Sequence, residues 1–490
     1  NIASGSNNIW YNIIEKEAKM AKFKPYKIDQ QMLFPPSVRD YVPESHLARL
    51  VDKVVEQLDT SAIENKYSEL GQNTYHPKIL IKLLFYGYAV GDRSGRKISC
   101  KSETDTAYMY LSQMYKPDFR TVNDFRKKNL TELSGYFVDI VRLCKELGLV
   151  SIGQINIDGT KIKANAANRR TKTREEYEQW VKRIDEKINA ILKEAERTDS
   201  HEDEVYGDNR GDELPKDINT EEKLKKKIEE IMKTMRDEKK NLTDSDARFM
   251  KNGQGRIDAG YNCQTAVTRE QIIVSSEVIT SPTDHRALEL MVKSSDQNLR
   301  EQVKEIAADS GYSSYDNYEY LEKNGKTGYI PDQDFRKETT EGKCPYHQDN
   351  FRYDTEQDNY LCPEGKPLEL YRIRRKNYGY REFHHKIYKG KGCLKCEKKL
   401  QCTKQRYRTI LREDRRALLE EMRRRLQTEE GRKKYTQRMW TTEPIFGHLK
   451  FNLGYRQFSL RTLPKVRGEF RLMCIGSNLK KMNKLLIMAN

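Results

Sequence analysis

The sequence predicts an α/β protein with one mixed sheet, a helical domain before it, and two insertions. Three observations support this. Short apolar runs of strand length alternate with helical segments over residues 151–172 and 248–331. Apolar residues recur at helical spacing through residues 41–150 and 173–247. Residues 332–430 follow neither period and hold most of the cysteines.

Residues 41–150 are expected to form several short helices. Leu47, Leu50 and Val54 begin the first apolar stripe, and the run 79–90 ends at Gly91. A polar, basic helix follows the short turn at 118–121. That order is typical of a helix-turn-helix unit that contacts DNA. The alternative is a plain helical bundle whose exposed face is basic.

The stretch 154–170 reads QINIDGTKIKANAANRR and is central to the functional interpretation. Ile155 and Ile157 alternate as in a strand with one buried face, and Asp158 lies on the opposite face. Gly159 leaves the backbone beside the carboxylate without a side chain, so that another group can approach it. Several cations follow, including Lys161. The pattern favours a metal-binding acid beside a polyanion, with a strand-end turn aspartate as the alternative.

Two charged helical stretches after this strand predict an antiparallel hairpin inserted into the sheet. Their apolar residues keep a 4-3-4-3 spacing, which indicates a narrow seam between two helices. Strands then resume at 260–268 and 271–280, and a later apolar run ends at Asp309. A helix is expected over 282–295. In this order the first and fourth strands are neighbours, so Asp158 and Asp309 converge.

Charge and composition favour nucleic acid as the partner. The 490-residue chain carries a net charge of +17. Residues 369–440 alone hold 24 Lys and Arg against nine Asp and Glu. No run of 18 apolar residues occurs, so no membrane span is expected. Five of the nine cysteines lie between residues 344 and 402, which indicates a metal site in a reducing cytoplasm rather than disulfides.

Three acids lie in distinctive local sequences: IDGTK around Asp158, ADSGYSS around Asp309, and TEPIFGHLKFNLGYR around Glu443. Two Asp and one Glu suffice to hold two Mg²⁺, which activate a water or hydroxyl and stabilise the leaving oxygen in phosphodiester cleavage. Pro444 disfavours helical geometry at Glu443, so a break is expected there with Glu443 at a helix start. Asp258 and Asp332 are competing acids, interpreted as turn residues.

These three blocks resemble those of bacterial insertion-sequence DDE transposases, and the resemblance covers most of the chain outside the start and the helical hairpin. It implies an RNase H-like catalytic core with Asp158, Asp309 and Glu443 as catalytic and metal-binding residues. Tyr435, Arg438, Glu443 and Lys450 follow the order of the Tyr-Arg-Glu-Lys signature of some such enzymes. The gap between Arg438 and Glu443 holds four residues where that pattern has three.

A second metal site is expected at the cysteine cluster. Cys393 and Cys396 form one CxxC knuckle, and Cys362 and Cys402 supply two further thiols for a structural Zn²⁺. Cys344 with His347 is an alternative pair, and reduced, partly buried thiols without metal are the other alternative.

The stretch 371–388 mixes cations with aromatic residues, a composition suited to gripping a DNA backbone and stacking on unpaired bases. A surface β-hairpin is the alternative there. Trp440 is interpreted as either a base-stacking or a core residue. The expected DNA-binding residues are Lys161, Arg374, Arg375, Tyr435, Arg438 and Lys450.

The sequence therefore predicts a transposase that cleaves element ends and joins them to target DNA. Its expected cofactors are two Mg²⁺, with Mn²⁺ as an alternative, and structural Zn²⁺. We expect double-stranded DNA as partner, no membrane, a homodimer when ends are paired, and a place at the nucleoid in a bacterial cytoplasm. The alternatives are a metal-dependent nuclease without strand transfer and a non-catalytic zinc-containing DNA-binding protein.

The expected domains are an N-terminal arm (1–40), a helical DNA-binding domain (41–150), the catalytic core (151–172 and 248–331), the hairpin insertion (173–247), the Cys-rich basic insertion (332–430) and C-terminal helices of the core (431–490).

Overall fold

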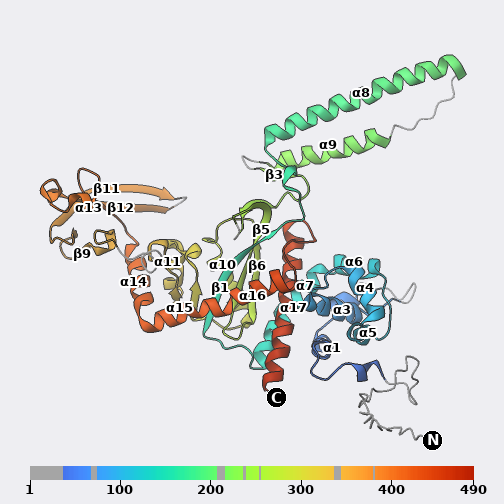
Figure 1. Ribbon diagram of the computed structural model, residues 1–490, viewed down its shortest axis with the longest axis horizontal. Helices are drawn as coiled ribbons and strands as arrows, with labels where there is room; N and C mark the ends of the chain where they lie inside the picture. Colours follow the sequence, from blue (N-terminus) through green and yellow to red (C-terminus); the bar gives the residue numbers. More distant parts are fainter. Residues whose placement is uncertain are drawn as a thin grey trace, which may run out of the picture.

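The computed structural model confirms the predicted α/β class, with a curled mixed sheet and a helical N-terminal region (Figure 1). The arm predicted for residues 1–40 lies almost wholly outside the described residues. None of the described helices is both long and apolar enough to cross a lipid bilayer. The structure describes residues 37–67, 74–206, 216–235, 239–252, 255–335, 344–378 and 381–489.

The central sheet has six strands in the order β4-β5-β1-β7-β8, with β6 also paired to β5. β1 is antiparallel to β5 and parallel to β7, and β7 is parallel to β8. The predicted meander of the first three long strands and the predicted contact between the first strand and the strand ending near Asp309 are both confirmed. The strands are β1 (Gln154–Lys163), β4 (Arg248–Lys251), β5 (Ile257–Val267), β6 (Ile273–Ile279), β7 (Glu305–Ala308) and β8 (Thr327–Tyr329).

The parallel register of β1 and β7 brings two carboxylates to neighbouring strands. Ile157 pairs with Ala308, so Asp158 and Asp309 are the next residues along each strand. Ile155 and Ile157 are buried on one face of β1, as the alternation predicts, and Asp158 points to the other face.

Two sequence predictions beside the sheet are wrong. The helix expected over 282–295 is α10 (Leu288–Leu299), and residues 280–287 before it form a loop. Asp258, interpreted as a turn residue, lies within β5, where it pairs with Met250 of β4. The short strand β4 had no distinct apolar run to mark it. Asp332 does lie outside the strands, after β8, where its carboxylate accepts hydrogen bonds from Arg423.

The N-terminal region is a cluster of short helices. Two of them begin at aspartate caps, since Asp118 accepts a hydrogen bond from the Arg120 amide and Asp105 from the Ala107 amide. The helix α4 was not expected, because its sequence is largely polar. The helices are α1 (Leu47–Gln57), α2 (Ser61–Glu64), α3 (Pro77–Val90), α4 (Gly95–Thr104), α5 (Thr106–Leu111), α6 (Phe119–Lys128) and α7 (Leu130–Glu146), after the 3₁₀ turn η1 (Val38–Tyr41).

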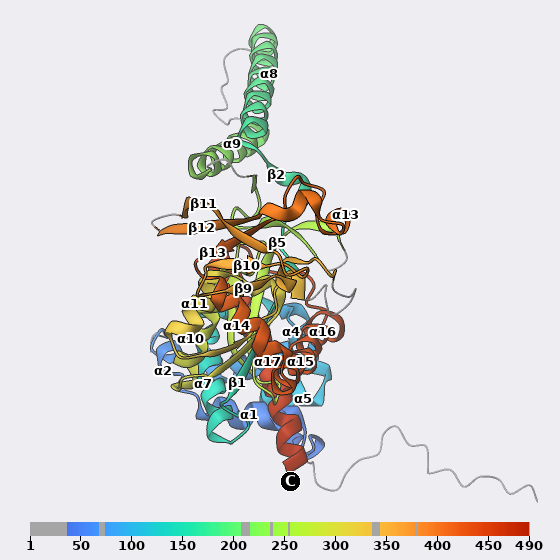
Figure 2. The same ribbon diagram turned by 90° about the vertical axis from the view of Figure 1, so that its left-hand side faces the viewer.

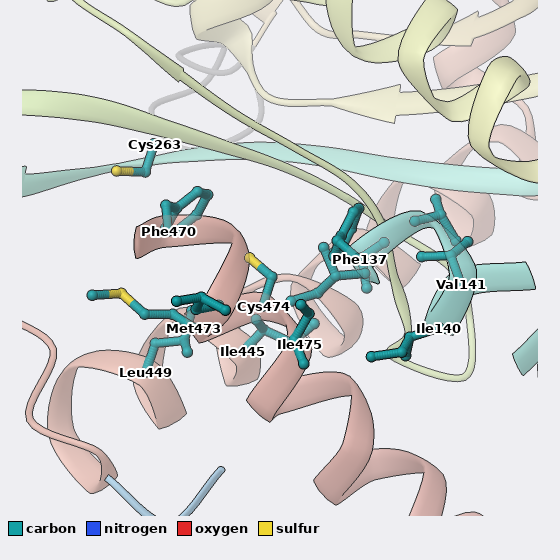
Figure 3. Packing of buried hydrophobic residues seen from close by; sticks show 14 of the residues in the cluster. Phe137, Ile140, Val141, Cys263, Ile445, Leu449, Phe470, Met473, Cys474 and Ile475 are labelled. Carbon is teal, nitrogen blue, oxygen red and sulfur yellow. The ribbon is translucent and has the colours of Figure 1, made fainter. Parts of the chain in front are cut away.

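The C-terminal helix α17 (Leu463–Ala489) joins the helical region to the sheet by packing against α3, α7 and β6. Figure 3 shows Phe470, Cys474 and Ile475 of α17 in one apolar core with Cys263 of β5 and Phe137 of α7. The buried Asn478 side chain pairs with both the amide and the carbonyl of Ile273, at 2.9 and 2.8 Å. The N-terminal helices and the sheet therefore share one continuous core.

The predicted helical hairpin is present and extends away from the sheet (Figures 1 and 2). It consists of α8 (Arg174–Tyr206) and α9 (Lys216–Thr234), and its base is closed by pairing of β2 (Thr171–Lys172) with β3 (Lys240–Asn241). Its apolar seam forms a core of its own, separate from the core under the sheet. The buried residues of that seam are Tyr177, Ile184, Ile228, Ile231, Met235 and Leu242.

The Cys-rich basic segment folds into a second, antiparallel sheet in the order β13-β12-β11-β10-β9. Its two long strands pair directly, so residues 371–378 and 381–388 are paired antiparallel strands, and their contact with DNA stays a prediction. Its core is also small and separate. The strands are β9 (Arg352–Asp354), β10 (Asn359–Leu361), β11 (Pro367–Tyr378), β12 (Arg381–Gly390) and β13 (Thr409–Glu413).

Of the remaining elements, those after residue 415 lead back from the second sheet to the core. Between α15 and α16 lies Thr442, so the break expected before Pro444 is confirmed, with Glu443 as the first residue of the new helix. The elements are α11 (Tyr315–Lys323), α13 (Lys399–Cys402), α14 (Arg416–Gln427), α15 (Glu429–Thr441), α16 (Glu443–Gly447) and a π-helical turn η6 (His448–Asn452).

Candidate active site

Asp158 is a buried carboxylate held by three donors. Its oxygens accept hydrogen bonds from the Gly159 amide at 2.8 Å, from Arg438 Nη1 at 3.0 Å and from Thr442 Oγ1 at 3.2 Å. Burial raises the pKa of Asp158 from its ordinary value of 3.8 to about 6; Arg438 opposes this rise, and the nearby Asp309 adds to it. This strand therefore presents an acid whose negative charge is poorly compensated.

Asp309 ends β7 beside it and caps the 3₁₀ turn η3 (Ser310–Tyr312), where its Oδ1 accepts from the Gly311 amide at 2.9 Å. Burial also raises the pKa of Asp309, Arg438 lowers it, and the Asp284 carboxylate raises it further. Two buried, mutually repelling carboxylates on adjacent strands form a place where a divalent cation is stabilising.

Glu443 directly follows Thr442 along the chain and is the first residue of α16. Its side chain is exposed, and the preceding residue, Thr442, is the one that donates to Asp158. Among the described residues, no group of three or more His, Cys, Asp or Glu is arranged so as to hold a metal ion. The donor set of Asp158 and Asp309 fits Mg²⁺, and a place for Glu443 beside them stays a prediction.

The other predicted DNA contacts divide into two regions. Arg438 is at the acids, and its guanidinium lies 5.8 Å from the ring centre of Tyr435. Arg374 and Arg375 are exposed on β11, in the second sheet, which Figure 1 shows apart from the central one. Trp440 is 72% exposed, so the alternative of a core tryptophan is wrong.

Lys161 and Lys450 lie together in a groove beside the acids. The groove has a volume of about 490 Å³. Burial lowers the pKa of Lys450, and the charge of Lys161 lowers it further. Five of the eleven residues that line the groove are cations, namely Lys161, Lys163, Arg256, Lys450 and Arg456; the carboxylate of Asp258 and the exposed Phe451 line it as well.

Sequence reasoning missed Asp284, an acid whose charge acts on Asp309. It lies in the loop between β6 and α10, and its Oδ1 accepts hydrogen bonds from Asn262, Gln264 and Lys161. The available signal was the pair Asn262 and Gln264, two amides on the same face of a strand that is otherwise apolar. Two such amides, both fully buried, require a polar partner.

The four predicted zinc ligands line one small cavity of about 30 Å³ in the second sheet. Burial raises the pKa of Cys402, Arg408 opposes this, and Cys393, Cys362 and Cys396 raise it further, so all four sulfurs lie within electrostatic range. Backbone amides donate to two of them: Lys366 N to Cys362 Sγ at 3.2 Å and Arg408 N to Cys393 Sγ at 3.5 Å. Cys344 is exposed.

The curled mixed sheet with its surrounding helices is consistent with an RNase H-like core. Residues 361–483 match the family model "Transposase DDE domain", and residues 36–128 match "Transposase domain (DUF772)". No curated protein and no solved structure gives a significant match.

The two matches confirm the resemblance to insertion-sequence DDE transposases, so the chain carries the domains of a DNA transposase, a DNA-cleaving enzyme. The first match includes Glu443 and the cysteine cluster, while Asp158 and Asp309 lie outside both matched segments. The Tyr-Arg-Glu-Lys signature stays a prediction.

Proposed function

We propose that this chain cleaves the ends of a DNA element and joins them to target DNA by two-metal-ion phosphodiester hydrolysis and strand transfer. The observation that carries the proposal is the pair of buried carboxylates, Asp158 and Asp309, on adjacent parallel strands beside a cationic groove. In this proposal Asp158, Asp309 and Glu443 hold two Mg²⁺, or Mn²⁺, which lower the pKa of a nucleophilic water or hydroxyl and stabilise the leaving oxygen.

The residues around the acids have distinct roles in the proposal. Arg438 and Thr442 fix the orientation of the Asp158 carboxylate through hydrogen bonds to the same oxygen, Oδ2. Tyr435 packs beside Arg438 and limits its movement. Lys450 faces the groove, where its ammonium contacts phosphates of the bound strand.

The remaining parts of the chain are assigned to DNA recognition. We propose that the helical domain 41–150 binds element ends and that Arg374 and Arg375 on β11 contact a second stretch of backbone. Double-stranded DNA is then the substrate for both the element ends and the target. A homodimer holds two ends together, at the nucleoid of a bacterial cytoplasm.

The test is a set of single alanine variants of Asp158, Asp309 and Glu443, with Glu301→Gln as a control acid that does not line the groove. Each alanine variant is expected to lose Mg²⁺-dependent cleavage of an element-end duplex by at least about 1,000-fold while end binding stays within about twofold. Full cleavage by Asp158→Ala refutes the assignment of the centre. Full cleavage by Glu443→Ala alone removes Glu443 from it.

Pre-cut ends separate transposition from simple cleavage. A transposase joins a pre-cut end with a free 3′ hydroxyl to target DNA, and a nuclease without strand transfer does not. If the unaltered protein binds DNA without added metal and cleaves no DNA in its presence, the non-catalytic alternative is correct.

We further propose that Cys362, Cys393, Cys396 and Cys402 hold one structural Zn²⁺. Support comes from the shared cavity and from the two amide-to-sulfur hydrogen bonds, which favour thiolate over thiol. Purified protein is expected to contain one zinc per chain, and Cys393→Ser to lose it together with thermal stability. The control Cys100→Ser, an exposed cysteine outside the cluster, is expected to keep its zinc. Zinc-free protein with unchanged melting refutes this part.

A further inference from the structure

Asp284 forms an ion pair with Lys161 immediately beside the two catalytic carboxylates. The Lys161 ammonium lies 3.2 Å from Asp284 Oδ1, and the side chains are 19% and 20% exposed. The same oxygen accepts from Asn262 Nδ2 at 2.6 Å and from Gln264 Nε2 at 2.8 Å. Three donors on one oxygen fix the position of this carboxylate.

The two amides that hold Asp284 are themselves rigid. Asn262 and Gln264 are fully buried on β5 and bonded to one another at 2.9 Å. The fully buried Tyr312 hydroxyl, one turn after Asp309, donates to the Gln264 carbonyl oxygen. A buried network whose members bond one another has few alternative arrangements. Asp284 is therefore presented to Lys161 by a fixed scaffold.

Two glycines let this scaffold lie close to the catalytic acids. A Cβ at Gly159 would be 2.3 Å from Gln264 Nε2 and 3.0 Å from Asp284 Oδ1. A Cβ at Gly311 would be 2.9 Å from Asp309 Oδ1 and 3.2 Å from Asp284 Oδ2. Each glycine is next to, or two residues after, a proposed metal-binding aspartate. The close approach thus requires glycine at both positions.

Lys161 stands between the acids and the cationic groove. It lines the groove together with Lys450, and its charge acts on Asp309. A free lysine at this strand position samples many rotamers, so an ion pair with a fixed carboxylate restricts where its ammonium lies. When a DNA strand lies in the groove and one of its phosphates is near Asp309, that phosphate is also close to the Lys161 ammonium.

We propose that Asp284 is a positioning residue for DNA cleavage: it holds the Lys161 ammonium beside Asp309, where that ammonium contacts a phosphate of the strand being cut. This inference rests on the proposed function. It gives Asp284 a role through Lys161 and no direct contact with the substrate. Asn262 and Gln264 support the role by fixing Asp284.

The test is a double-mutant cycle on Asp284 and Lys161 with the full-length protein. Cleavage of an element-end duplex is measured under single-turnover conditions in Mg²⁺, and end binding is measured by fluorescence anisotropy in Ca²⁺. Asp284→Ala and Lys161→Ala are each expected to slow cleavage about 10- to 100-fold, with end affinity changed by less than about threefold. The double variant is expected to be no slower than Lys161→Ala, because Asp284 acts through that lysine. Asp284→Asn, which keeps an acceptor for both amides, is expected to recover part of the rate.

The chain offers a matched control. Lys145 and Glu301 form an ion pair at 2.9 Å, and neither residue lines the groove. Glu301→Gln is expected to cleave at the unaltered rate. Circular dichroism and melting temperatures establish that each variant is folded.

Wild-type cleavage by folded Asp284→Ala overturns the inference. Losses that multiply in the double variant also overturn it, because Asp284 then acts independently of Lys161. An unaltered protein that cleaves no element end in Mg²⁺ or Mn²⁺ refutes the proposed function instead, so the two failures are distinguishable.

Discussion

Replacing Asp158 by asparagine is expected to stabilise the metal-free protein at neutral pH while abolishing cleavage. The raised pKa of Asp158 means that the folded state prefers the protonated acid, whereas the unfolded chain ionises near the ordinary value of 3.8. Stability from this group is therefore greatest at low pH, falls as the pH rises from about 4 to about 6, and stays lost above that range. Asparagine is neutral throughout and avoids the loss.

The size of the effect follows from the shift. Raising a carboxyl pKa from 3.8 to about 6 corresponds to about 3 kcal/mol of lost stability at pH 7.5, since each unit is worth about 1.4 kcal/mol. At pH 5 the unfolded chain is ionised and the folded site is mostly protonated, so about half of that loss has occurred. Because the Asp158 side chain is only 15% exposed, solvent screens this effect little.

The assay compares urea unfolding of the wild type and Asp158→Asn in EDTA at pH 5 and pH 7.5. The variant's advantage is expected to grow by about 1.5 kcal/mol between the two pH values. Asp358→Asn is a control of opposite sign. Partial burial raises the pKa of Asp358, but hydrogen bonds from Lys386, Tyr353 and Tyr388 lower it to about 2. Replacing this carboxylate therefore costs stability above pH 4. The reasoning is refuted if Asp158→Asn is less stable than the wild type at pH 7.5 and the difference between their unfolding free energies is the same at pH 5.

Three further changes test the packing around the site. Asn478→Ala leaves the buried amide and carbonyl of Ile273 without partners and is expected to cost about 2–4 kcal/mol in urea unfolding; an unchanged midpoint contradicts it. Gly476→Ala places a Cβ 2.6 Å from the Tyr88 carbonyl carbon and is expected to cost about 1–3 kcal/mol in the same measurement, whereas Gly135→Ala, with open space at that position, is the neutral control. Replacing residues 174–234 with a short Gly-Ser linker is expected to preserve the melting temperature of the rest, because the hairpin core is separate; a cooperative loss of the whole fold by circular dichroism contradicts this.

Local sequence patterns predicted much of the fold because their causes are local. The alternation of Ile155 and Ile157 follows from one buried face of β1, and the 4-3-4-3 spacing of the hairpin follows from its two-helix seam. Pro444 ends one helix and starts another for reasons confined to two residues. The pairing of β1 with β7 followed from the order of strands and helices.

What the sequence did not indicate depends on contacts between distant segments. Asp284 lies in a loop with no periodicity, and only the folded chain brings it to Lys161, 123 residues earlier. α10 begins later than expected because residues 280–287 are used for that loop. The short strand β4 exists through its pairing with β5, since four residues alone carry no reliable pattern. The exposure of Trp440 likewise depends on which face of α15 meets the sheet.

The shared packing of α17 against α3, α7 and β6 has a consequence for how a DNA end is handled. The helices that match the DUF772 transposase domain are not attached by a flexible tether, because their interior is continuous with that of the sheet. Under the proposed function, a duplex bound by those helices meets the acids at a fixed distance along its axis. The fold itself then sets the number of base pairs between the recognised sequence and the cut.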